Sequence, residues 1–498
     1  MTTGYDRIRL ESLRDKVISA EKAADLIKDG MVVGSSGFTK AGDSKAVLPA
    51  LAEKAKNEKI KITLMTGASL GHGTDGKLAE AGVLSKRMPF QVDKTLRDKI
   101  NKGEILFIDQ HLSESAELLH NKNLPPVDIA IIEAAFIDRD GSIVPTTSVG
   151  NSVTFAALAK HVIIEINTAV SEDVYGIHDI YQAENYPHRN VIPIVAPWNK
   201  IGRRSIPLDP NKVIGIVFTA KKDSPADIAE PDAKTTAIAR HILQFFENEV
   251  HLGHLSDRLL PIQAGIGKVA NAVLMGFKDS NFYDLTMFSE VLQDSTFDLI
   301  DSGKLSFASA SSVTVSEACY ERVFGNLQKY REKFVLRPQN ISNTPGLIRR
   351  LGVIAINTAI EFDIYGNVNS THISGTKIMN GIGGSGDFAR NAYLSIFVTQ
   401  AASKENAISH VLPMISHVDH TEHDVDILVT DIGLADLRGL APRERAQAII
   451  DNCAHPDYRD ELQSYFDRAC ERGGHTPHLL EEAFSWHIRF SETGSMKK

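Results

Sequence analysis

The sequence predicts an α/β protein of two tandem domains, each built on a largely parallel sheet with duplicated topology. Short apolar, β-favouring runs alternate with helical segments, as in a parallel sheet that is buried on both faces. A charged segment with two prolines, residues 221–234, interrupts this pattern near the middle of the 498 residues. A stretch of the first half also recurs in the second, which indicates that one topology is present twice.

The first predicted domain covers residues 1–222. A helix is expected at residues 19–29, where Ser19 begins a segment that resembles a capping box. A strand that runs into a glycine turn follows at residues 31–39, and a second helix follows at residues 44–56. The remaining apolar runs predict buried strands at residues 60–65, 105–108, 129–132, 162–166 and 213–218.

The second predicted domain covers residues 236–498, after a linker at residues 223–235. It opens with a helix and contains the apolar run that leads to Glu290. Further strands, with a glycine turn after the first, are expected at residues 260–267, 305–308, 353–357 and 425–430, and the chain from residue 442 onward is expected to be helical.

The internal repeat relates residues 129–150 to residues 354–375 without gaps. Eight of the 22 aligned positions are identical, at an offset of 225. At a similar offset, Ile62-Thr-Leu-Met-Thr-Gly67 overlays Leu285-Thr-Met-Phe-Ser-Glu290, so the first copy has Gly67 where the second has Glu290. This difference predicts one catalytic domain and one domain that closes over it.

Composition and charge exclude several classes of function. The net charge of −9 comes from 54 basic and 63 acidic residues without a polybasic block, which argues against binding to nucleic acid or to an anionic membrane. Cys319, Cys453 and Cys470 have no metal-ligand spacing, and three widely separated thiols suit a reducing compartment. The first residues lack an apolar signal core, and no run of about 18 apolar residues occurs. We therefore expect a cytoplasmic protein.

Glu290 is the predicted nucleophile. In an open α/β sheet, ligands collect beyond the carboxyl ends of the strands, and Glu290 follows an apolar strand at that end. A carboxylate there can attack a thioester carbonyl and form a covalent intermediate. The alternative, which a lone glutamate would favour, is an ordinary residue bonded to a neighbouring backbone amide.

Two glycine-rich segments can present backbone amides to a ligand. The first, Asn380-Gly-Ile-Gly-Gly-Ser-Gly-Asp-Phe388, contains the spacing of a dinucleotide fingerprint, but it lies deep in the second domain instead of in a first βαβ unit. We therefore disfavour NAD(P) and interpret the segment as an oxyanion pocket. The second, Gly265-Ile-Gly-Lys-Val269, precedes a helix and could receive an anion, although a tight strand-to-helix turn explains it equally well.

The segment His417-Val-Asp-His-Thr-Glu-His-Asp424 has histidines spaced by three and three acids. On a helix this spacing could place metal ligands on one face, but an extended or turn conformation is as compatible with the sequence. We favour a hydrogen-bonded polar structure near the active cleft over a metal site, and we expect no metal.

Together these motifs resemble the acetyl-CoA hydrolase/transferase family, a branch of the class I CoA-transferases. The resemblance spans nearly the whole chain, through the segments Gly34-Ser-Ser-Gly-Phe-Thr39, Thr66-Gly-Ala-Ser69, Ser289-Glu-Val-Leu-Gln-Asp294 and Ala435-Asp-Leu-Arg-Gly-Leu-Ala-Pro442. It implies two α/β domains of CoA-transferase fold, a homodimer, and a glutamate that forms a glutamyl-CoA thioester. The implied partners are acyl-CoA and small carboxylates. Coenzyme A is then a substrate, and no cofactor is permanently bound.

The resemblance also implies roles for individual residues. Glu290 is the nucleophile, Asn343 fixes it, and the amides of Ile266 and Gly384 are the oxyanion donors. The residues implied in holding CoA are Gly265, Ile266, Gly267, Lys268, Val269, Gly384, Gly386, Phe388 and Lys404. Ser69 and Asp431 are the candidates on the substrate side.

Three departures from the family pattern concern the acid that is used. Asp431 stands where the family often has Glu, and Val92 stands where succinate:acetate transferases present a Thr. No arginine lies between Arg204 and Arg240 to match the one those transferases present. The expected activity is CoA transfer between acetyl-CoA or succinyl-CoA and acetate or succinate. An acetyl-CoA hydrolase, a catalytically silent CoA-binding protein and a nicotinamide oxidoreductase are the alternatives, in that order.

Overall fold

The computed structural model describes residues 4–184, 187, 189–227 and 230–498. The chain divides into two compact units, and each unit includes segments that are distant in sequence. Unit 1 comprises Met1–Asp227, Met287–Phe297 and Phe307–Leu347, and unit 2 comprises Ile228–Thr286, Asp298–Ser306 and Ile348–Lys498. The segment around Glu290 thus packs with the N-terminal residues. The division into residues 1–222 and 236–498 remains a proposal about the duplicated halves, and residues 228–229 of the expected linker lie outside the described residues.

A seven-stranded parallel sheet forms the centre of unit 1. Its strands, in chain order, are β1 (Val32–Ser35), β2 (Ile62–Met65), β3 (Leu84–Met88), β4 (Leu106–Phe107), β5 (Ile129–Ala134), β8 (His161–Asn167) and β9 (Val213–Thr219). They lie in the order β4-β3-β2-β1-β5-β8-β9, and all their pairings are parallel. Every residue of β5 is buried, as expected for a central strand covered on both faces.

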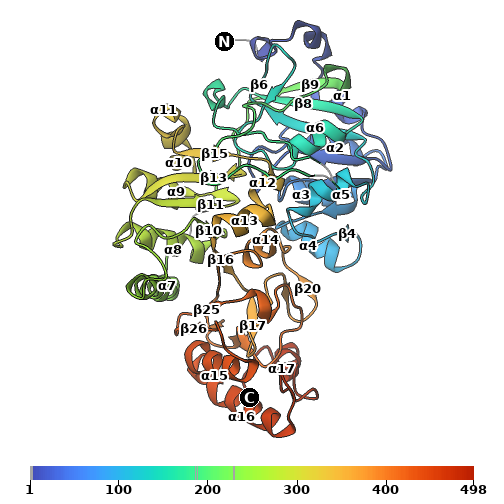
Figure 1. Ribbon diagram of the computed structural model, residues 1–498. Coiled ribbons are helices and arrows are strands. Elements are labelled where there is room, and N and C mark those ends of the chain that lie inside the picture. The colour runs from blue at the N-terminus through green and yellow to red at the C-terminus, as the bar shows by residue number, and fades with distance from the viewer. Residues whose placement is uncertain (1–3, 185–186, 188, 228–229) are drawn as a thin grey trace. The chain divides into compact units, whose positions relative to one another are not determined.

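Helices and short hairpins complete the N-terminal part of unit 1 (Figure 1). They are α1 (Ala20–Asp25), α2 (Val47–Ala55), α3 (Thr74–Glu80), α4 (Lys94–Asn101), α5 (Glu114–His120), α6 (Ser152–Leu158), β6 (Phe136–Ile137) and β7 (Ile143–Val144), with 3-10 turns at Gly4–Arg7, Glu11–Lys16, Glu172–Val174 and Pro210–Lys212. Ser19 caps α1 by accepting a hydrogen bond from the Lys22 amide, which confirms the predicted helix start. Apolar residues of α1, α2 and the strands form one hydrophobic cluster, so the amphipathic helices cover the sheet.

Residues 285–351 carry short strands that alternate with helices. These are β11 (Leu285–Phe288), β12 (Val291–Leu292), α9 (Asp294–Asp301), β13 (Leu305–Ala310), β14 (Ser312–Val313), α10 (Glu317–Phe324), α11 (Leu327–Tyr330), β15 (Phe334–Leu336), α12 (Gln339–Ser342) and α13 (Pro345–Leu351). β13 pairs in parallel with β15, and β12 pairs in parallel with β14. The strand that was predicted to lead to Glu290 is present as β11.

The remaining elements run from residue 233 to the C-terminal helices. They are α7 (Ala233–His251), β10 (Ile262–Ala264), α8 (Lys268–Lys278), β16 (Ile354–Thr358), β17 (Glu361–Asp363), β18 (Val368–Asn369), β19 (His372–Ile373), β20 (Lys377–Ile378), α14 (Ser385–Ala389), β21 (Leu394–Val398), β22 (Ala402–Ser403), β23 (Ile408–Ser409), β24 (Val411–Leu412), a 3-10 turn at Glu422–Asp424, β25 (Ile427–Val429), β26 (Leu434–Asp436), α15 (Pro442–Cys453), α16 (Pro456–Arg472) and α17 (Ser485–Thr493).

The second large sheet repeats the strand order of the first. Its order is β15-β13-β11-β10-β16-β21-β25-β26, so that β10, β11, β13 and β15 follow one another in space as β1, β2, β3 and β4 do. The pairings β10–β16, β16–β21 and β21–β25 are parallel, and the edge strand β26 pairs antiparallel with β25. The predicted α/β class with largely parallel sheets and duplicated topology is confirmed.

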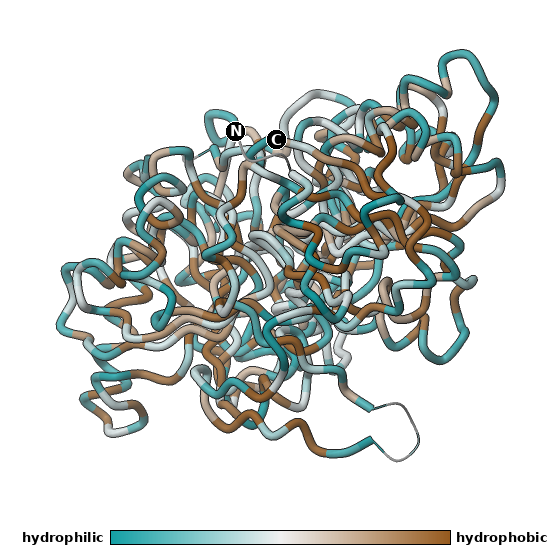
Figure 2. Tube along the Cα trace, turned by 90° about the horizontal axis from the view of Figure 1, so that it is seen from above, coloured by the Kyte–Doolittle hydropathy of each residue, from teal (hydrophilic) through white to brown (hydrophobic). Residues whose placement is uncertain are grey.

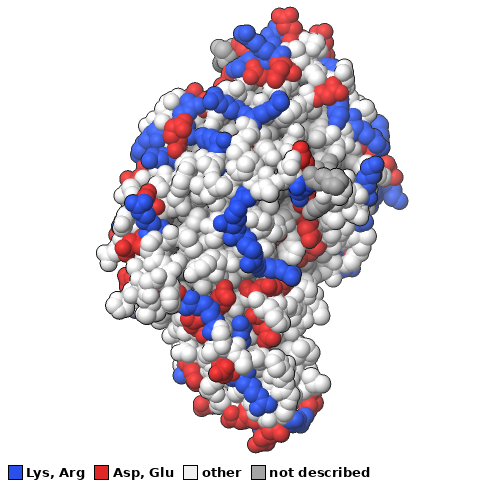
Figure 3. Space-filling view, in the orientation of Figure 1, with Lys and Arg blue, Asp and Glu red and all other residues white. Residues whose placement is uncertain are grey.

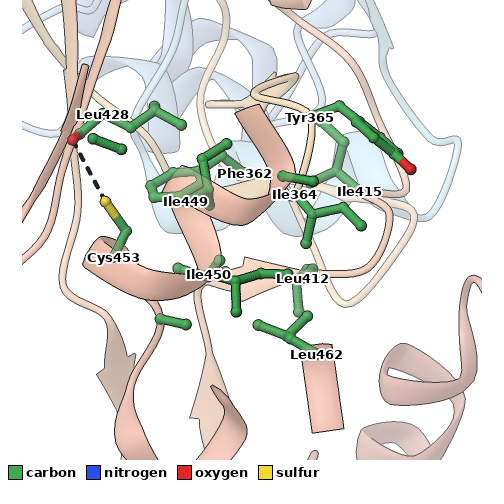
Figure 4. Packing of buried hydrophobic residues seen from close by; sticks show 14 of the residues in the cluster. Phe362, Ile364, Tyr365, Leu412, Ile415, Leu428, Ile449, Ile450, Cys453 and Leu462 are labelled. Atoms are coloured by element: carbon green, nitrogen blue, oxygen red, sulfur yellow. Dashed lines mark hydrogen bonds between the residues drawn. The ribbon is translucent and has the colours of Figure 1, made fainter. Parts of the chain in front are cut away.

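The C-terminal helices of unit 2 pack over a hydrophobic cluster. Figure 4 shows Ile449 and Ile450 of α15 beside Phe362, Leu412 and neighbouring apolar residues, with the Cys453 thiol donating to the Leu428 carbonyl at 3.5 Å. Burial raises the pKa of this thiol to about 12, so Cys453 is a packing residue. Many of the outermost loops of the chain are hydrophilic (Figure 2), and on the face drawn in Figure 3 Lys and Arg lie among Asp and Glu.

Candidate active site

The backbone of Glu290 is held between two strands of unit 1. β11 ends at Phe288, and the Ser289 amide donates to the Ser309 carbonyl at 2.8 Å. The Glu290 carbonyl accepts from the amides of Ser311 at 2.8 Å and Ser312 at 3.1 Å. Because the backbone is fixed on both sides, the direction in which the Glu290 side chain leaves it is defined. The predicted position beyond the carboxyl end of a strand is therefore correct.

Asn343 holds the Glu290 carboxylate. Its Nδ2 donates to Oε1 of Glu290 at 2.7 Å, and Asn343 is the residue directly after α12. The start of α12 is itself anchored, because the Gln339 amide donates to the Gly150 carbonyl at 2.9 Å. Just before it, the fully buried Arg337 donates to Ser309 Oγ at 2.8 Å and pairs with Asp179. The structure thus brings together two residues that are 53 positions apart.

The environment of Glu290 shifts its proton affinity. Burial raises the pKa of Glu290 to about 7, and the hydrogen bond from Asn343 lowers it in part. Although the residue keeps some exposure, its carboxyl group is largely removed from water. Near neutral pH the carboxylate form is therefore available, and it carries less hydration that must be lost before attack. A buried, oriented carboxylate with a shifted pKa is typical of a catalytic site.

An apolar cluster lies next to Glu290 in unit 1. Val291, the following residue, packs with Phe38, Ala68 and Leu112, and the partly buried Phe90 packs against them. Ser69 directly follows Ala68; it is 2% exposed, and its carbonyl accepts from the Lys40 amide at 3.0 Å. Ser69 and Glu290 are thus each adjacent in sequence to a residue of the same cluster. Val92, one of the three expected departures from the family pattern, is 39% exposed.

The first copy of the repeat has no room for a side chain at the position that matches Glu290. A Cβ atom at Gly67 would lie 2.7 Å from the Gly37 carbonyl oxygen and 3.0 Å from Gln339 Oε1. A backbone oxygen cannot move aside without shifting its loop, so a carboxylate is excluded there. The sequence indicated that the two copies differ, and the structure gives the physical reason.

In unit 2, the turn at residues 265–269 joins β10 to α8. The Gly265 amide donates to the Ile356 carbonyl at 3.0 Å, and Gly267 has a φ of 116°, which favours glycine. Ile266 is 50% exposed. Lys268 donates to Asp232 at 2.8 Å, and this bond lowers the pKa of Asp232. A phosphate bound by Lys268 would have to compete with that ion pair.

The glycine-rich segment precedes the short helix α14 in unit 2. Gly384 is its N-cap residue, and Gly383 has a φ of 59°. The Phe388 side chain is 0% exposed, so it packs in the interior of the unit and anchors the segment there. A helix of this length does not continue a dinucleotide-binding βαβ unit, which removes the structural context that NAD(P) binding requires.

Lys404 and Asp431 lie near one hairpin of unit 2. Lys404 is exposed at the turn between β22 and β23, with its Nζ 5.6 Å from the ring centre of Phe490. Asp431 accepts from the Ala401 amide at 2.6 Å, one residue before β22. Lys234 Nζ lies 4.0 Å from Asp431 and donates to the Ala402 carbonyl at 2.6 Å. Asp431 therefore fixes the hairpin backbone, and Lys404 is available at its tip.

The histidine-rich segment 417–424 serves hydrogen bonding in unit 2. His417 Nε2 lies 3.2 Å from Asp419, while His423 has an 80% exposed side chain. His420 is buried and contacts Ser385 of α14. Within residues 4–184, 187, 189–227 and 230–498, no group of three or more His, Cys, Asp or Glu side chains is arranged to hold a metal.

Sequence reasoning missed a buried ionic cluster in unit 1. Lys45 Nζ lies 2.9 Å from Glu133, 2.8 Å from Asp223 and 3.4 Å from Asp43. Burial, opposed by Lys45, raises the pKa of Glu133 to about 8 and also raises that of Asp43. The available signal was a glutamate inside the apolar run of β5. The cluster ties β5 to the loop that holds Asp43 and Lys45 and to the loop that holds Asp223.

Across the portion of the chain that the structure describes, none of the helices combines the length and the apolar character that crossing a bilayer requires.

Known proteins resemble this chain along almost its full length. Residues 5–218 match the acetyl-CoA hydrolase/transferase N-terminal domain, and residues 319–466 match the C-terminal domain of the same family. The chain is 50% identical to a succinyl-CoA:acetate CoA-transferase of Clostridium kluyveri, over 99% of this chain and 92% of that protein. It is 45% identical to an acetyl-CoA hydrolase of Kluyveromyces lactis, over 99% and 98% of the two chains. The crystal structure of a 4-hydroxybutyrate CoA-transferase from Porphyromonas gingivalis has the same fold, with a TM-score of 0.64 at 20% identity over 92% of this chain and 99% of that one. The chain therefore belongs to the acetyl-CoA hydrolase/transferase family and is an enzyme of that family.

Proposed function

We propose that the enzyme transfers CoA from an acyl-CoA to a carboxylate, with acetyl-CoA or succinyl-CoA as donor and acetate or succinate as acceptor. The observation that carries this proposal is the Glu290 carboxylate, which is oriented by Asn343 at 2.7 Å and has a pKa raised by burial to about 7. The 50% identity to a succinyl-CoA:acetate CoA-transferase supports the choice of substrates.

The proposed first half-reaction proceeds in two steps. Glu290 Oε attacks the thioester carbonyl, and the C–S bond breaks to give an acyl-glutamyl anhydride and the CoA thiolate. The thiolate then attacks the glutamyl carbonyl, which expels the acyl group as a carboxylate and leaves a glutamyl-CoA thioester. A second carboxylate reverses these steps and departs as a new acyl-CoA. Water enters neither half-reaction, and no net proton is gained or lost.

Further residues supply the binding in this proposal. The amides of Ile266 and Gly384 are the oxyanion donors, and Gly386 and the residues of the 265–269 turn contact CoA. Lys404, which is exposed at its hairpin tip, contacts a CoA phosphate. Binding energy from the large CoA body can then be used at the reacting carbonyl, which a small acid could not provide. Ser69 and Asp431 act on the carboxylate side.

Intact-protein mass spectrometry tests the covalent step. The enzyme is incubated with acetyl-CoA and, separately, with succinyl-CoA, digested and peptide-mapped, with Glu290→Ala as control. A CoA-sized adduct on the Glu290 peptide that disappears when acetate or succinate is added supports the proposal and shows which acid resolves it. No adduct from either donor, while CoA still binds, would refute covalent transfer.

A hydrolase is the second candidate, because the chain is 45% identical to an acetyl-CoA hydrolase over nearly its full length. In that case water resolves the anhydride or the glutamyl thioester. Release of CoA that is independent of added carboxylate would establish hydrolysis, whereas turnover that requires the acceptor would establish transfer.

Three further properties belong to the same proposal: assembly as a homodimer, a cytoplasmic location, and the use of CoA as a substrate without a resident cofactor. On the face drawn in Figure 3 both signs of charge are interspersed, and the whole chain has a net charge of −9, which supports an enzyme that does not bind nucleic acid or anionic membranes. Light scattering of the purified full-length chain would give its mass relative to the 54.6 kDa monomer.

A further inference from the structure

The glycine-rich segment of residues 380–386 is held at both ends by two consecutive residues, Asp419 and His420. All of these residues lie in unit 2. The segment needs such support, because four of its seven residues are glycines and glycine has wide backbone freedom. Its amides can be aimed at a ligand only if contacts from outside the segment restrict that freedom.

His420 fixes the carboxyl end of the segment through Ser385. The Ser385 hydroxyl donates to the Ile382 carbonyl at 2.7 Å, and His420 Nε2 lies 3.1 Å from the same hydroxyl oxygen. A hydroxyl has one hydrogen, which the Ile382 bond takes, so Nε2 of His420 is the donor to Ser385. The hydrogen bonds from His420 through Ser385 to Ile382 span Gly383 and Gly384, the two residues between the bonded ends.

Asp419 fixes the amino end through a neighbouring turn. Its carboxylate accepts from the Ser370 amide at 2.7 Å and from Thr371 Oγ1 at 2.9 Å. The Thr371 carbonyl in turn accepts from the Met379 amide at 2.7 Å, directly before the segment begins. The Asp419 side chain is 4% exposed, so these bonds are shielded from competing water.

His420 is itself rigidly placed. Its amide and carbonyl both pair with Val368 of β18, at 3.1 and 2.8 Å, and its ring lies 4.6 Å from that of Phe397 in β21. The residue is 2% exposed. Because His420 is fixed to β18 and packs against β21, its hydrogen bond to Ser385 holds the glycine-rich segment in a defined position relative to these strands.

We propose that Asp419 and His420 are positioning residues for CoA transfer, which set the conformation of residues 380–386 and hence the direction of the Gly384 amide. The inference rests on the proposed function, in which that amide stabilises the oxyanion. A donor that is misaligned loses much of its value in the transition state, whereas CoA held by other residues still binds.

The test measures the rate of adduct formation on Glu290, kcat, KM for acetyl-CoA and the thermal midpoint of the full-length enzyme. His420→Leu is expected to slow adduct formation about 10- to 100-fold, with KM changed by no more than about twofold. His420→Gln, whose amide N–H can replace Nε2–H, is expected to restore most of the rate. His423→Leu is the matched control, because that histidine lies in the same segment with an 80% exposed side chain, and its rate should equal that of the wild type.

A double-mutant cycle with Ser385→Ala identifies the route of the effect. If His420 acts through Ser385, His420→Leu has little further effect in the Ser385→Ala background. Equal rates for wild type and His420→Leu, or full additivity of the two substitutions, would overturn the inference while the adduct on Glu290 upholds the proposed function. Absence of the adduct from the wild type would overturn the proposed function and the inference with it. Should His420→Leu fail to fold, Ser385→Ala and Asp419→Asn decide between these outcomes by the same rates.

Discussion

Replacing Glu290 with Gln should stabilise the protein at alkaline pH. The raised pKa of Glu290 means that ionising it in the folded protein costs more than ionising it in the unfolded chain. The folded state therefore binds the proton more tightly, and stability falls as pH rises from the unfolded value of 4.5 through the folded value of about 7. Glutamine keeps the shape of the side chain and an oxygen that accepts from Asn343, but it carries no charge. The variant therefore does not lose this stability as pH rises.

The magnitude follows from the two pKa values. A difference of about 2.5 between them corresponds to about 3 kcal/mol at pH 8 and to under about 1 kcal/mol at pH 5. The partial exposure of the residue makes these values upper bounds. For a unit of this size, about 3 kcal/mol raises the thermal midpoint by roughly 5 °C.

Scanning calorimetry of wild type and Glu290→Gln at pH 5 and pH 8 measures the difference directly. The thermal midpoint of the variant should lie several degrees above that of the wild type at pH 8. At pH 5 the two midpoints should be nearly equal. Equal midpoints at both values, or a less stable variant at pH 8, would show that the carboxylate is not destabilised by its site. Glu332→Gln, at an exposed glutamate of the same unit, controls for the general effect of removing a charge.

Further predictions concern the same unit. In stopped assays across pH, adduct formation by the wild type should rise through about pH 7 and level off above it, because only the ionised Glu290 attacks; a flat profile would contradict this. Asn343→Ala should move that midpoint upward and lower the rate at pH 7 about tenfold, since the bond that lowers the pKa is lost; an unchanged midpoint would remove the assigned role. Gly67→Ala should cost about 1–3 kcal/mol in chemical unfolding, because the added carbon meets a backbone oxygen; a neutral result would mean that the loop yields. Lys45→Met should cost about 3–5 kcal/mol, increasingly at higher pH, because it leaves buried carboxylates unpaired; calorimetry at pH 6 and 8 would detect this, and a pH-independent loss would contradict it.

Strands with apolar sequences could be predicted because their burial on both faces leaves a clear pattern. β5 and β16 were expected close to where they occur. β3 was missed, since its sequence Leu84-Ser-Lys-Arg-Met88 contains charges. Arg87 is nevertheless 0% exposed, because Asp75 pairs with it at 2.8 Å. A pairing partner that comes from another element is not visible in the local pattern.

The candidate site shows the same limit. Glu290 could be located from the strand before it, and the glycine-rich segments from their composition. The role of Asn343 came from the family resemblance, since its partner lies 53 positions away. The contacts of Asp419 with Thr371 span 48 positions. The histidine spacing around them favoured a hydrogen-bonded polar structure over a metal site, but it did not identify these partners. Hydrogen bonds between distant loops depend on the tertiary fold, so a local motif could not reveal them.

The crowded backbone around Gly67 bears on how two active centres could arise in one chain. A point mutation at the Gly67 codon could introduce the glutamate that the second copy has at the matching position. Its side chain would not fit, because the Gly37 carbonyl occupies the space. Placing a carboxylate there would require the neighbouring loop to be rebuilt first, with no gain until the last step. The asymmetry between the two copies is therefore difficult to reverse in evolution, and it leaves the chain with one carboxylate at this position of the repeat.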